Sequence, residues 1–360
     1  MVFRLSPTRR GLAFGLAAAV SFGISAPLAK RLLDHASPQM LAGLLYVGAF
    51  LALSVVGRRS RGEARLRRAD LPRMATMIFA GGVVAPVLLL FGLERVTGVA
   101  GSLLLNLEGP FTIVIGVAIF REHLPRQALS GALVIFGGAA LLGLGTGGVH
   151  ADWIGVLLIA GACACWGLDN NLTQSLTLRD PRAIVWCKTG VAGTVNVVVA
   201  LMIGERFPEV SVLAGALLLG AVSYGLSVYL DALALRQLGA AREAAIFAVA
   251  PFAGALLAPL VLPETLGLRE LVAGALMAVG VVLLLRERHE HLHVHEPLDH
   301  DHIHVHDEHH RHSHDAGVDT GVDASVDITE PHAHEHHHDA LEHSHPHVSD
   351  IHHRHPHGTG

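Results

Sequence analysis

The chain has 360 residues, of which 51% are hydrophobic and 16% charged, and its formal net charge is -5 when all 27 histidines are neutral. Of these histidines 24 follow Leu285, whereas the preceding part is built mainly from Leu, Ala, Val and Gly. This uneven distribution excludes a single soluble globular domain, and we expect no nucleic-acid partner.

Ten apolar stretches between Gly11 and Leu285 predict membrane-spanning helices. Each has about 17 to 25 residues, the length that crosses the hydrocarbon layer as a helix. Spanning strands would alternate apolar and polar side chains, but a stretch such as 211–222 is apolar on every face. The predicted fold is therefore an all-α integral membrane protein. Its spans are expected at 11–33, 39–57, 74–93, 98–120, 128–146, 152–174, 183–204, 211–232, 240–262 and 267–285.

The Lys and Arg residues near the ends of these stretches predict the orientation. With both termini on one side of the membrane, that side carries 19 of these cations and the other side carries 5. Cytoplasmic loops are enriched in Lys and Arg. We therefore expect a multi-pass protein of the cytoplasmic (inner) membrane, with both termini and the His-rich tail in the cytoplasm.

The first 285 residues contain an internal repeat with an offset of about 141 to 144 residues. The matched positions, in order, are Phe22-Gly23 with Trp166-Gly167, Ser37-Pro38 with Asp180-Pro181, Pro110-Phe111 with Pro251-Phe252, and Glu122-His123-Leu124 with Glu264-Thr265-Leu266. The predicted repeats cover 11–146 and 152–285, with five spans each. An odd number of spans inserts the second repeat upside down, an arrangement suited to alternating access.

These motifs resemble those of the EamA-like branch of the drug/metabolite transporter superfamily. The resemblance rests on the five plus five spans, on Trp166-Gly167, on the Pro-containing entries to spans two and seven, and on Arg121-Glu122-His123-Leu124 after span four. It implies a secondary transporter, often an exporter, that moves a small solute between the repeats. One departure is Phe22-Gly23, where the family usually has Trp-Gly. The chain has no Gly-x-x-x-x-Gly-Lys-Ser/Thr phosphate loop, so we expect neither ATP coupling through that motif nor an enzyme.

Charged groups inside a span are costly and need a partner, a watery cavity or a function. Glu108 lies near the middle of span four, beside Asn106 and ahead of Pro110, which removes a backbone donor. A broken helix with a carboxylate at this depth suits a proton or cation site. The alternative is a protonated glutamic acid that is hydrogen-bonded across the bundle.

The end of span six, from Cys165 to Gln174, is the most polar membrane stretch. Cys165, Asp169 and Thr173 share one helical face, and this face is expected to line the transport cavity. The alternative places Asp169 at an interfacial helix end, paired with Lys188 or Arg179. The residues expected to form the cavity or coupling site are Asn106, Glu108, Cys165, Trp166, Asp169, Asn170, Asn171 and Lys188.

A possible gate consists of Asp231, Arg242 and Glu243, which flank the loop between spans eight and nine. The alternative for these charges is simple snorkelling into the headgroup layer.

Residues 286–360 form the His-rich tail, which has few apolar groups and is predicted to be disordered. Its closely spaced imidazoles suit Zn(II), Ni(II), Co(II) or Cu(II). The expected metal ligands are His289, His291, His293, His295, His300, His302, His304, His306, His343, His345 and His347. Alternatives are a proton-sensing tail and a low-complexity segment without function.

The sequence thus predicts a ten-span secondary transporter in a lipid bilayer that exports a divalent transition metal or a metal-linked solute. One alternative cargo is a small organic metabolite, with the tail as a metal or pH regulator. Another alternative is a membrane-anchored metal buffer or sensor that transports nothing. No cofactor is required for transport, and a homodimer is possible.

Overall fold

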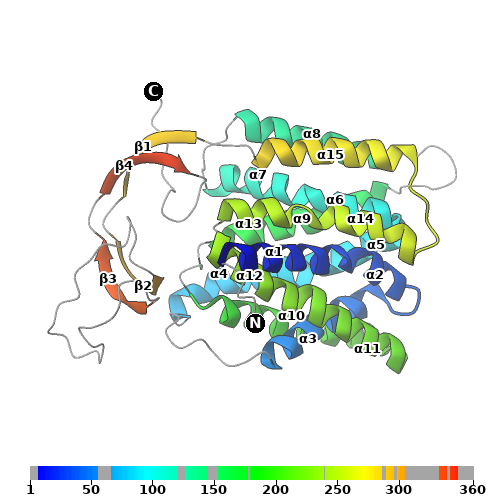
Figure 1. Cartoon of the computed structure of the whole chain (residues 1–360). Helices are drawn as coiled ribbons and strands as arrows, with labels where there is room; N and C mark the ends of the chain where they lie inside the picture. The colour runs from blue at the N-terminus through cyan, green and yellow to red at the C-terminus, as the bar shows by residue number, and fades with distance from the viewer. Residues whose placement is uncertain are drawn as a thin grey trace, which may run out of the picture.

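The computed structural model describes residues 7–55, 66–120, 126–144, 153–174, 176, 179–238, 240–285, 289–295, 298–304, 332–338 and 341–347. The part before residue 286 is a bundle of helices aligned along one common direction (Figure 1). In the described part of the chain, nine helical segments are long and apolar enough to cross a membrane, and a shorter apolar helix covers 127–143. Together they follow the ten predicted spans in order. The predicted α-helical membrane fold is therefore confirmed.

The first repeat contains spans 1 to 5, three of which are divided into consecutive helices. Their bounds are α1 (Pro7–Gly23) and α2 (Ser25–Leu32) in span 1; α3 (Pro38–Val55) in span 2; η1 (Arg68–Asp70), α4 (Leu71–Met77), η2 (Ile78–Val84) and α5 (Ala85–Arg95) in span 3; α6 (Gly98–Leu104), η3 (Leu105–Leu107) and α7 (Glu108–Phe120) in span 4; and α8 (Arg126–Gly143) in span 5. Span 4 is interrupted before Pro110, as predicted. Pro110 has no N–H for the carbonyl of Asn106, and the turn at η3 tightens into a 3-10 helix.

The second repeat contains spans 6 to 10. Their bounds are α9 (Trp153–Gln174) in span 6; α10 (Pro181–Met202) in span 7; α11 (Val210–Leu219), η4 (Gly220–Leu226) and α12 (Ser227–Leu238) in span 8; α13 (Ala240–Phe247) and α14 (Ala250–Val261) in span 9; and α15 (Leu268–Leu285) in span 10. Asp180 begins α10 as an N-cap whose side chain accepts hydrogen bonds from Arg182 N and Ala183 N. The Asp-Pro entry to span 7 is therefore a helix start.

The two repeats share a backbone irregularity that the sequence did not predict. Both η2 and η4 are π-helices of 7 residues, and their first residues, Ile78 and Gly220, are 142 positions apart. This separation falls inside the predicted repeat offset. Pro86, just after η2, lacks the N–H that would continue an ordinary α-helical ladder. The repeat thus extends to the local backbone geometry.

Equivalent spans of the two repeats pack against each other. Span 2 packs against span 7 through α3 and α10, and span 5 against span 10 through α8 and α15. Small residues permit this close approach: a Cβ on Gly131 would lie 2.8 Å from the carbonyl oxygen of Gly280, and a Cβ on Gly280 would lie 2.8 Å from that of Gly131. The equivalent contact in the repeat is also close, because a Cβ on Gly138 would lie 3.1 Å from the carbonyl oxygen of Ala273.

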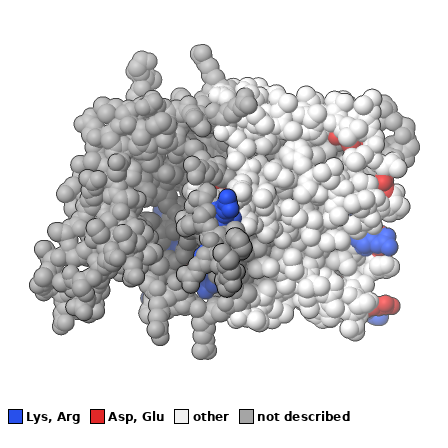
Figure 2. Space-filling view, in the orientation of Figure 1, with Lys and Arg blue, Asp and Glu red and all other residues white. Residues whose placement is uncertain are grey.

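The outside of the bundle is apolar between two charged ends. In Figure 2 the visible Lys, Arg, Asp and Glu atoms lie at the ends, and the band between them is white. Large apolar side chains of the spans are exposed, among them Leu157, Leu218 and Leu256, which are 65 to 66% exposed. In a soluble protein such a surface would be a liability, but in a bilayer it faces the lipid.

The tail contains four short strands where the sequence predicted no regular structure. β1 (His289–His295) pairs antiparallel with β4 (Leu341–His347), and β2 (Leu298–His304) pairs antiparallel with β3 (His332–His338). Most histidines of these strands alternate with other residues, and this alternation has the period of a strand. Two-stranded ribbons are at best marginally stable in water. The rest of 286–360, including the predicted ligand His306, lies outside the described residues.

Candidate functional site

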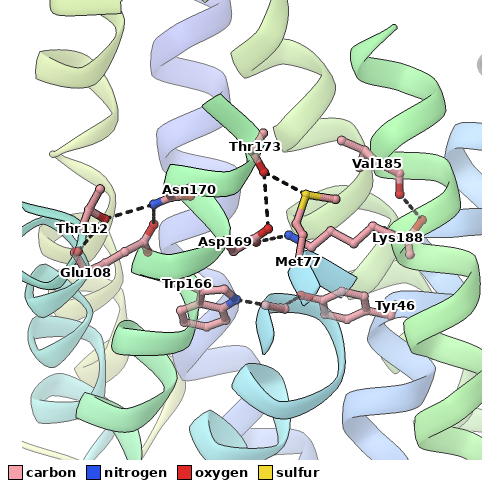
Figure 3. A network of polar contacts seen from close by, with 12 residues as sticks. Tyr46, Met77, Glu108, Thr112, Trp166, Asp169, Asn170, Thr173, Val185 and Lys188 are labelled. Atoms are coloured by element: carbon pink, nitrogen blue, oxygen red, sulfur yellow. Dashed lines mark hydrogen bonds and ion pairs between the residues drawn. The ribbon is translucent and has the colours of Figure 1, made fainter. Parts of the chain in front are cut away.

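The polar groups of the bundle converge on the π-helix η2. The carbonyl oxygen of Gly81 accepts hydrogen bonds from the hydroxyl of Tyr46 at 2.9 Å and from Nε1 of Trp166 at 3.0 Å (Figure 3). Both donors are buried. A π-helical turn does not use its carbonyls as an α-helix does, so this acceptor is available to side chains of neighbouring helices. Spans 2, 3 and 6 are thereby joined at one carbonyl group.

A buried ion pair lies beside this carbonyl. Nζ of Lys188 in α10 donates a hydrogen bond to Oδ2 of Asp169 in α9 (Figure 3). The Asp169 side chain is 5% exposed and that of Lys188 is 18% exposed. The other carboxylate oxygen, Oδ1, accepts from the hydroxyl of Thr173 at 3.4 Å. The predicted shared face of Asp169 and Thr173 is therefore an actual contact.

The absence of a side chain at Gly81 makes room for the ion pair. A Cβ at this position would overlap the carboxylate of Asp169. Gly81 lies near the middle of span 3, so this contact joins the last turns of α9 to the middle of span 3. Lys188, one of the two cations named in the interfacial alternative, is the partner of Asp169.

Glu108 forms a second polar contact with α9. Nδ2 of Asn170 donates to Oε1 of Glu108 at 2.7 Å and approaches Oγ1 of Thr112 at 3.4 Å. Glu108 is partly buried and Asn170 is exposed. Asn170 and Asp169 are neighbours in the chain but point to different helices in Figure 3. The helix α9 thus separates two acidic sites, one paired with a cation and one with an amide.

The remaining predicted cavity residues have different partners. The amide of Asn106 donates to Leu103 O at 2.9 Å and lies 3.9 Å from the sulfur of Met277, so it faces α15. Asn171 is buried, and its amide ties α9 to the carbonyl of Thr112 in α7 at 2.9 Å. Cys165 is a partly exposed free thiol. The structure brings Trp166, Asp169 and Lys188 together around Gly81 but not Asn106 or Asn171.

The predicted gate contains a pair of carboxyl groups. The carboxyl groups of Asp231 in α12 and Glu243 in α13 lie near enough to interact electrostatically. Oδ1 of Asp231 and Oε1 of Glu243 are buried without a partner in the described structure. The side chain of Arg242 lies outside the described residues.

Several site residues were not predicted from the sequence. Tyr46 was hidden in an apolar span, and Gly81 had no chemical signal beyond the Gly81-Gly82 pair ahead of Pro86. Tyr224 in η4 also belongs to this region, because its ring centroid lies 5.8 Å from that of Tyr46 and 5.8 Å from that of Phe22. Phe22, the equivalent of Trp166 in the first repeat, has no side-chain N–H, so its ring only packs against other rings.

The part of the chain that the structure describes offers no obvious metal centre: it contains no group of three or more His, Cys, Asp or Glu side chains arranged to hold a metal ion. Cys163 is buried, with its thiol 3.6 Å from Leu104 O. Cys163, Cys165 and Cys187 are all free. The membrane cysteines therefore act as small packing residues in this arrangement.

Comparisons with known proteins agree with this architecture. The model of the "EamA-like transporter family" matches residues 9–144 and 153–286. An "Uncharacterized transporter" of Methanothermobacter thermautotrophicus is 32% identical over 288 residues, covering 75% of this chain and 84% of that protein. A "Probable amino-acid metabolite efflux pump" of Salmonella typhimurium is 30% identical over 168 residues, covering 46% of this chain and 54% of that protein. A similarly named Escherichia coli protein is 29% identical over 180 residues, covering 49% of this chain and 58% of that protein.

A solved crystal structure shares the fold. Its TM-score is 0.55 with 17% sequence identity, and the superposition covers 76% of this chain and 94% of that one. The two family matches coincide with the two repeats seen in the π-helices and in the paired spans. The chain therefore belongs to the EamA-like transporter family, as its repeat motifs predicted, and it is a multi-pass membrane transporter of a small solute.

Proposed function

We propose that the protein exports a small zwitterionic metabolite, such as an amino acid, that binds between Asp169 and Lys188. The observation that carries the proposal is this buried pair of opposite charges beside the Gly81 carbonyl. The name of the Salmonella relative, a probable amino-acid metabolite efflux pump, favours the same class of cargo.

The chemistry of the pair explains why a zwitterion suits it. Removing two charges from water is costly, and in the empty protein Asp169 and Lys188 offset part of that cost by pairing with each other. An ammonium group of the cargo can replace Lys188 at the carboxylate, while a carboxylate of the cargo pairs with Lys188. Each buried charge then keeps a partner throughout binding, whereas a cargo of one sign would leave one of them unpaired.

Glu108 is the candidate coupling residue. It is a carboxylate within span 4, held by the amide of Asn170. Because Asn170 follows Asp169 in α9, movement of this helix would act on both sites. In this proposal Glu108 binds the proton that drives export, while Asp169 and Lys188 bind the cargo. The side with most Lys and Arg, the cytoplasm in our prediction, supplies the cargo.

Export of a divalent metal, the first prediction from the sequence, has less support. A metal cargo needs several ligands along its path, and the described helices contain no cluster of three or more suitable side chains. The names of the relatives mention no metal. The ion pair also disfavours a cation, because Lys188 would repel it.

Uptake into everted membrane vesicles tests the cargo class. We expect saturable, proton-dependent uptake of labelled alanine or serine and no uptake of zinc. Asp169→Asn and Lys188→Gln should each lower amino-acid uptake by about 100-fold, because truncating one partner of a buried charge pair costs several kcal/mol. Zinc uptake that disappears in Asp169→Asn, without amino-acid uptake, would support the metal exporter instead.

Asp70→Asn provides the matched control. Asp70 is also a buried acid in an ion pair, because its Oδ2 lies 2.9 Å from Nε of Arg179. This pair lies near the end of the bundle and does not contact Gly81. The variant should lose stability but keep its affinity for the cargo, which separates cargo binding from the general effect of breaking a buried ion pair.

For the tail we propose regulation by a divalent metal. In the β1–β4 ribbon, three histidines of each strand stand opposite one another: His289 with His347, His291 with His345 and His293 with His343. This register pairs histidine positions from two distant segments of the tail, and imidazole is a common ligand of divalent transition metals. Deletion of 289–360 should abolish zinc binding by the purified protein and leave cargo affinity unchanged. A loss of cargo affinity on deletion would contradict a purely regulatory tail.

A further inference from the structure

The two halves of the bundle differ in how tightly equivalent helices are enclosed. All seven residues of α6, the first half of span 4, are buried. The repeat offset makes α13, the first half of span 9, the equivalent of α6. Ala244 and Ala245 of α13 are exposed, whereas their counterparts Ser102 and Leu103 are buried. Equivalent sequences thus occupy a closed environment at one end and a more open one at the other.

The packing partners explain this difference. At the closed end, α6 packs against α14 and α2, which lie toward the right in Figure 1. Gly254 of α14 approaches so closely that a Cβ there would overlap Gly23 O and lie 2.9 Å from Oγ of Ser102. The symmetry-equivalent pairing, α13 with α7, is not among the well-packed helix pairs of the described residues. The end that carries α2, α6 and α14 is therefore the closed one.

The carboxylate of Glu264 joins the two repeats at this closed end. Oε1 of Glu264 accepts a hydrogen bond from Gly98 N at 2.8 Å, and Oε2 accepts one from Val99 N at 3.2 Å. Glu264 belongs to the loop between α14 and α15 in the second repeat, and both donors begin α6 in the first. The first amides of a helix have no partner within the helix, and they favour an anion.

Lys30 of α2 completes the charge arrangement around Glu264. Its Nζ donates to Leu93 O at 2.6 Å, and its charge interacts with that of Glu264. The contact of Glu264 is thus made to backbone amides with a cation nearby. A bond of this kind can break and re-form without repacking a core, because both partners find water once they separate.

We propose that Glu264 is the latch that closes this end of the transporter and releases it when the opposite end closes. The inference rests on alternating access by the inverted repeats and not on the identity of the cargo. Closing the α13 end requires α14, which continues span 9, to tilt away from α6. The bonds from Glu264 to Gly98 and Val99 are the polar contacts that this movement must break. By the Lys and Arg count, the latched end faces the outside.

The accessibility of Ser102 tests the latch directly. The probe is a Ser102→Cys substitution in the full chain with Cys163, Cys165 and Cys187 replaced by alanine, and the reagent is a membrane-impermeant maleimide added separately to each side of the membrane. With Glu264 present, the thiol should react slowly. Glu264→Gln should raise its reaction rate from one side by about tenfold, as expected from weakening a charge-assisted hydrogen bond.

Two controls distinguish the latch from a general loss of structure. Glu209→Gln removes an exposed carboxylate that makes no side-chain capping bond at the start of α11, and it should leave the rate unchanged. A second reporter, Ala200→Cys, is fully buried in α10 and should remain unreactive in Glu264→Gln. A Ser102→Cys rate within twofold of the parent, or equal exposure of both reporters, would overturn the proposal.

Discussion

The two π-helices have the same backbone geometry but serve different chemistry. At η2 the carbonyl of Gly81 accepts bonds from Tyr46 and Trp166, and the Asp169–Lys188 pair lies against it. At η4 the equivalent of Gly81 is Ser223, whose buried hydroxyl has no partner among the described residues. The repeat therefore preserves the irregular turn, while the side chains around it have diverged.

The surroundings of η4 are neutral and aromatic. Phe22 stands where the second repeat has Trp166, and Ser25 stands where it has Asp169. The ring of Tyr224 packs between those of Phe22 and Tyr46. The two repeats thus provide equivalent π-helical regions, and among the described residues only the region around η2 holds a buried pair of opposite charges. A site with this asymmetry can orient a cargo whose charges lie at one end.

The largest effect is expected from Lys188→Met, which leaves Asp169 buried without a cation. Breaking such a pair costs about 3–5 kcal/mol, so thermal unfolding in detergent should shift strongly downward and transport should be lost. The double variant Asp169→Leu with Lys188→Met removes both charges beside η2, so that this region becomes neutral like the region around η4. It should recover much of the stability but none of the transport, and recovery of both would contradict a role for the pair in cargo binding.

Gly81→Ala should have the next largest effect, because the added methyl group overlaps the carboxylate of Asp169. Overpacking of this kind costs about 1–3 kcal/mol, and here it also displaces the ion pair. Gly137→Ala is the matched control, since a Cβ at that glycine meets nothing within 4 Å. Unfolding temperature and amino-acid uptake should both fall in the first variant and stay unchanged or rise in the second.

Trp166→Phe gives the region around η2 the same side chain that Phe22 provides at the equivalent position of the first repeat. The variant keeps an aromatic ring but loses the bond from Nε1 to Gly81 O, while Tyr46 remains a donor to the same oxygen. We expect a loss of about 1 kcal/mol in stability and a several-fold lower uptake. Trp186→Phe removes a similar bond, to Oγ of Ser54, at an exposed position, and it should leave uptake unchanged.

The spans and their repetition were predictable because hydrophobic length and motif order are properties of the chain itself. The break ahead of Pro110 was predictable for the same reason, since proline removes a donor wherever it stands. The pairing of side chains between different spans was not predictable from the sequence. Asn106 and Glu108 are close in sequence, but residues two apart project in different directions on a helix. One consequently faces α15, and the other faces Asn170 on α9.

The π-helices were not predictable from hydrophobic periodicity. Both lie in segments that are apolar on most faces. The change from an α-helical to a π-helical turn therefore leaves no break in the spacing of polar and apolar residues along the sequence. For the same reason Gly81 was not recognised as the centre of the site, although its chemical neighbours Trp166, Asp169 and Lys188 were. The acceptor is a main-chain carbonyl, which every residue has, and only the packed structure shows which one is available.

The smallest expected effect concerns the unpartnered hydroxyl of Ser223. A buried polar group without a hydrogen bond is destabilising, so Ser223→Ala should raise stability by about 1 kcal/mol and leave uptake unchanged. Ser227 is the matched control, because it is equally buried one turn later but its Oγ donates to Ala18 O at 3.1 Å. Ser227→Ala should lower stability by a similar amount. If Ser223→Ala were destabilising as well, the Ser223 hydroxyl would have a hydrogen-bond partner. The region around η4 would then be a second polar site, comparable to that around Gly81.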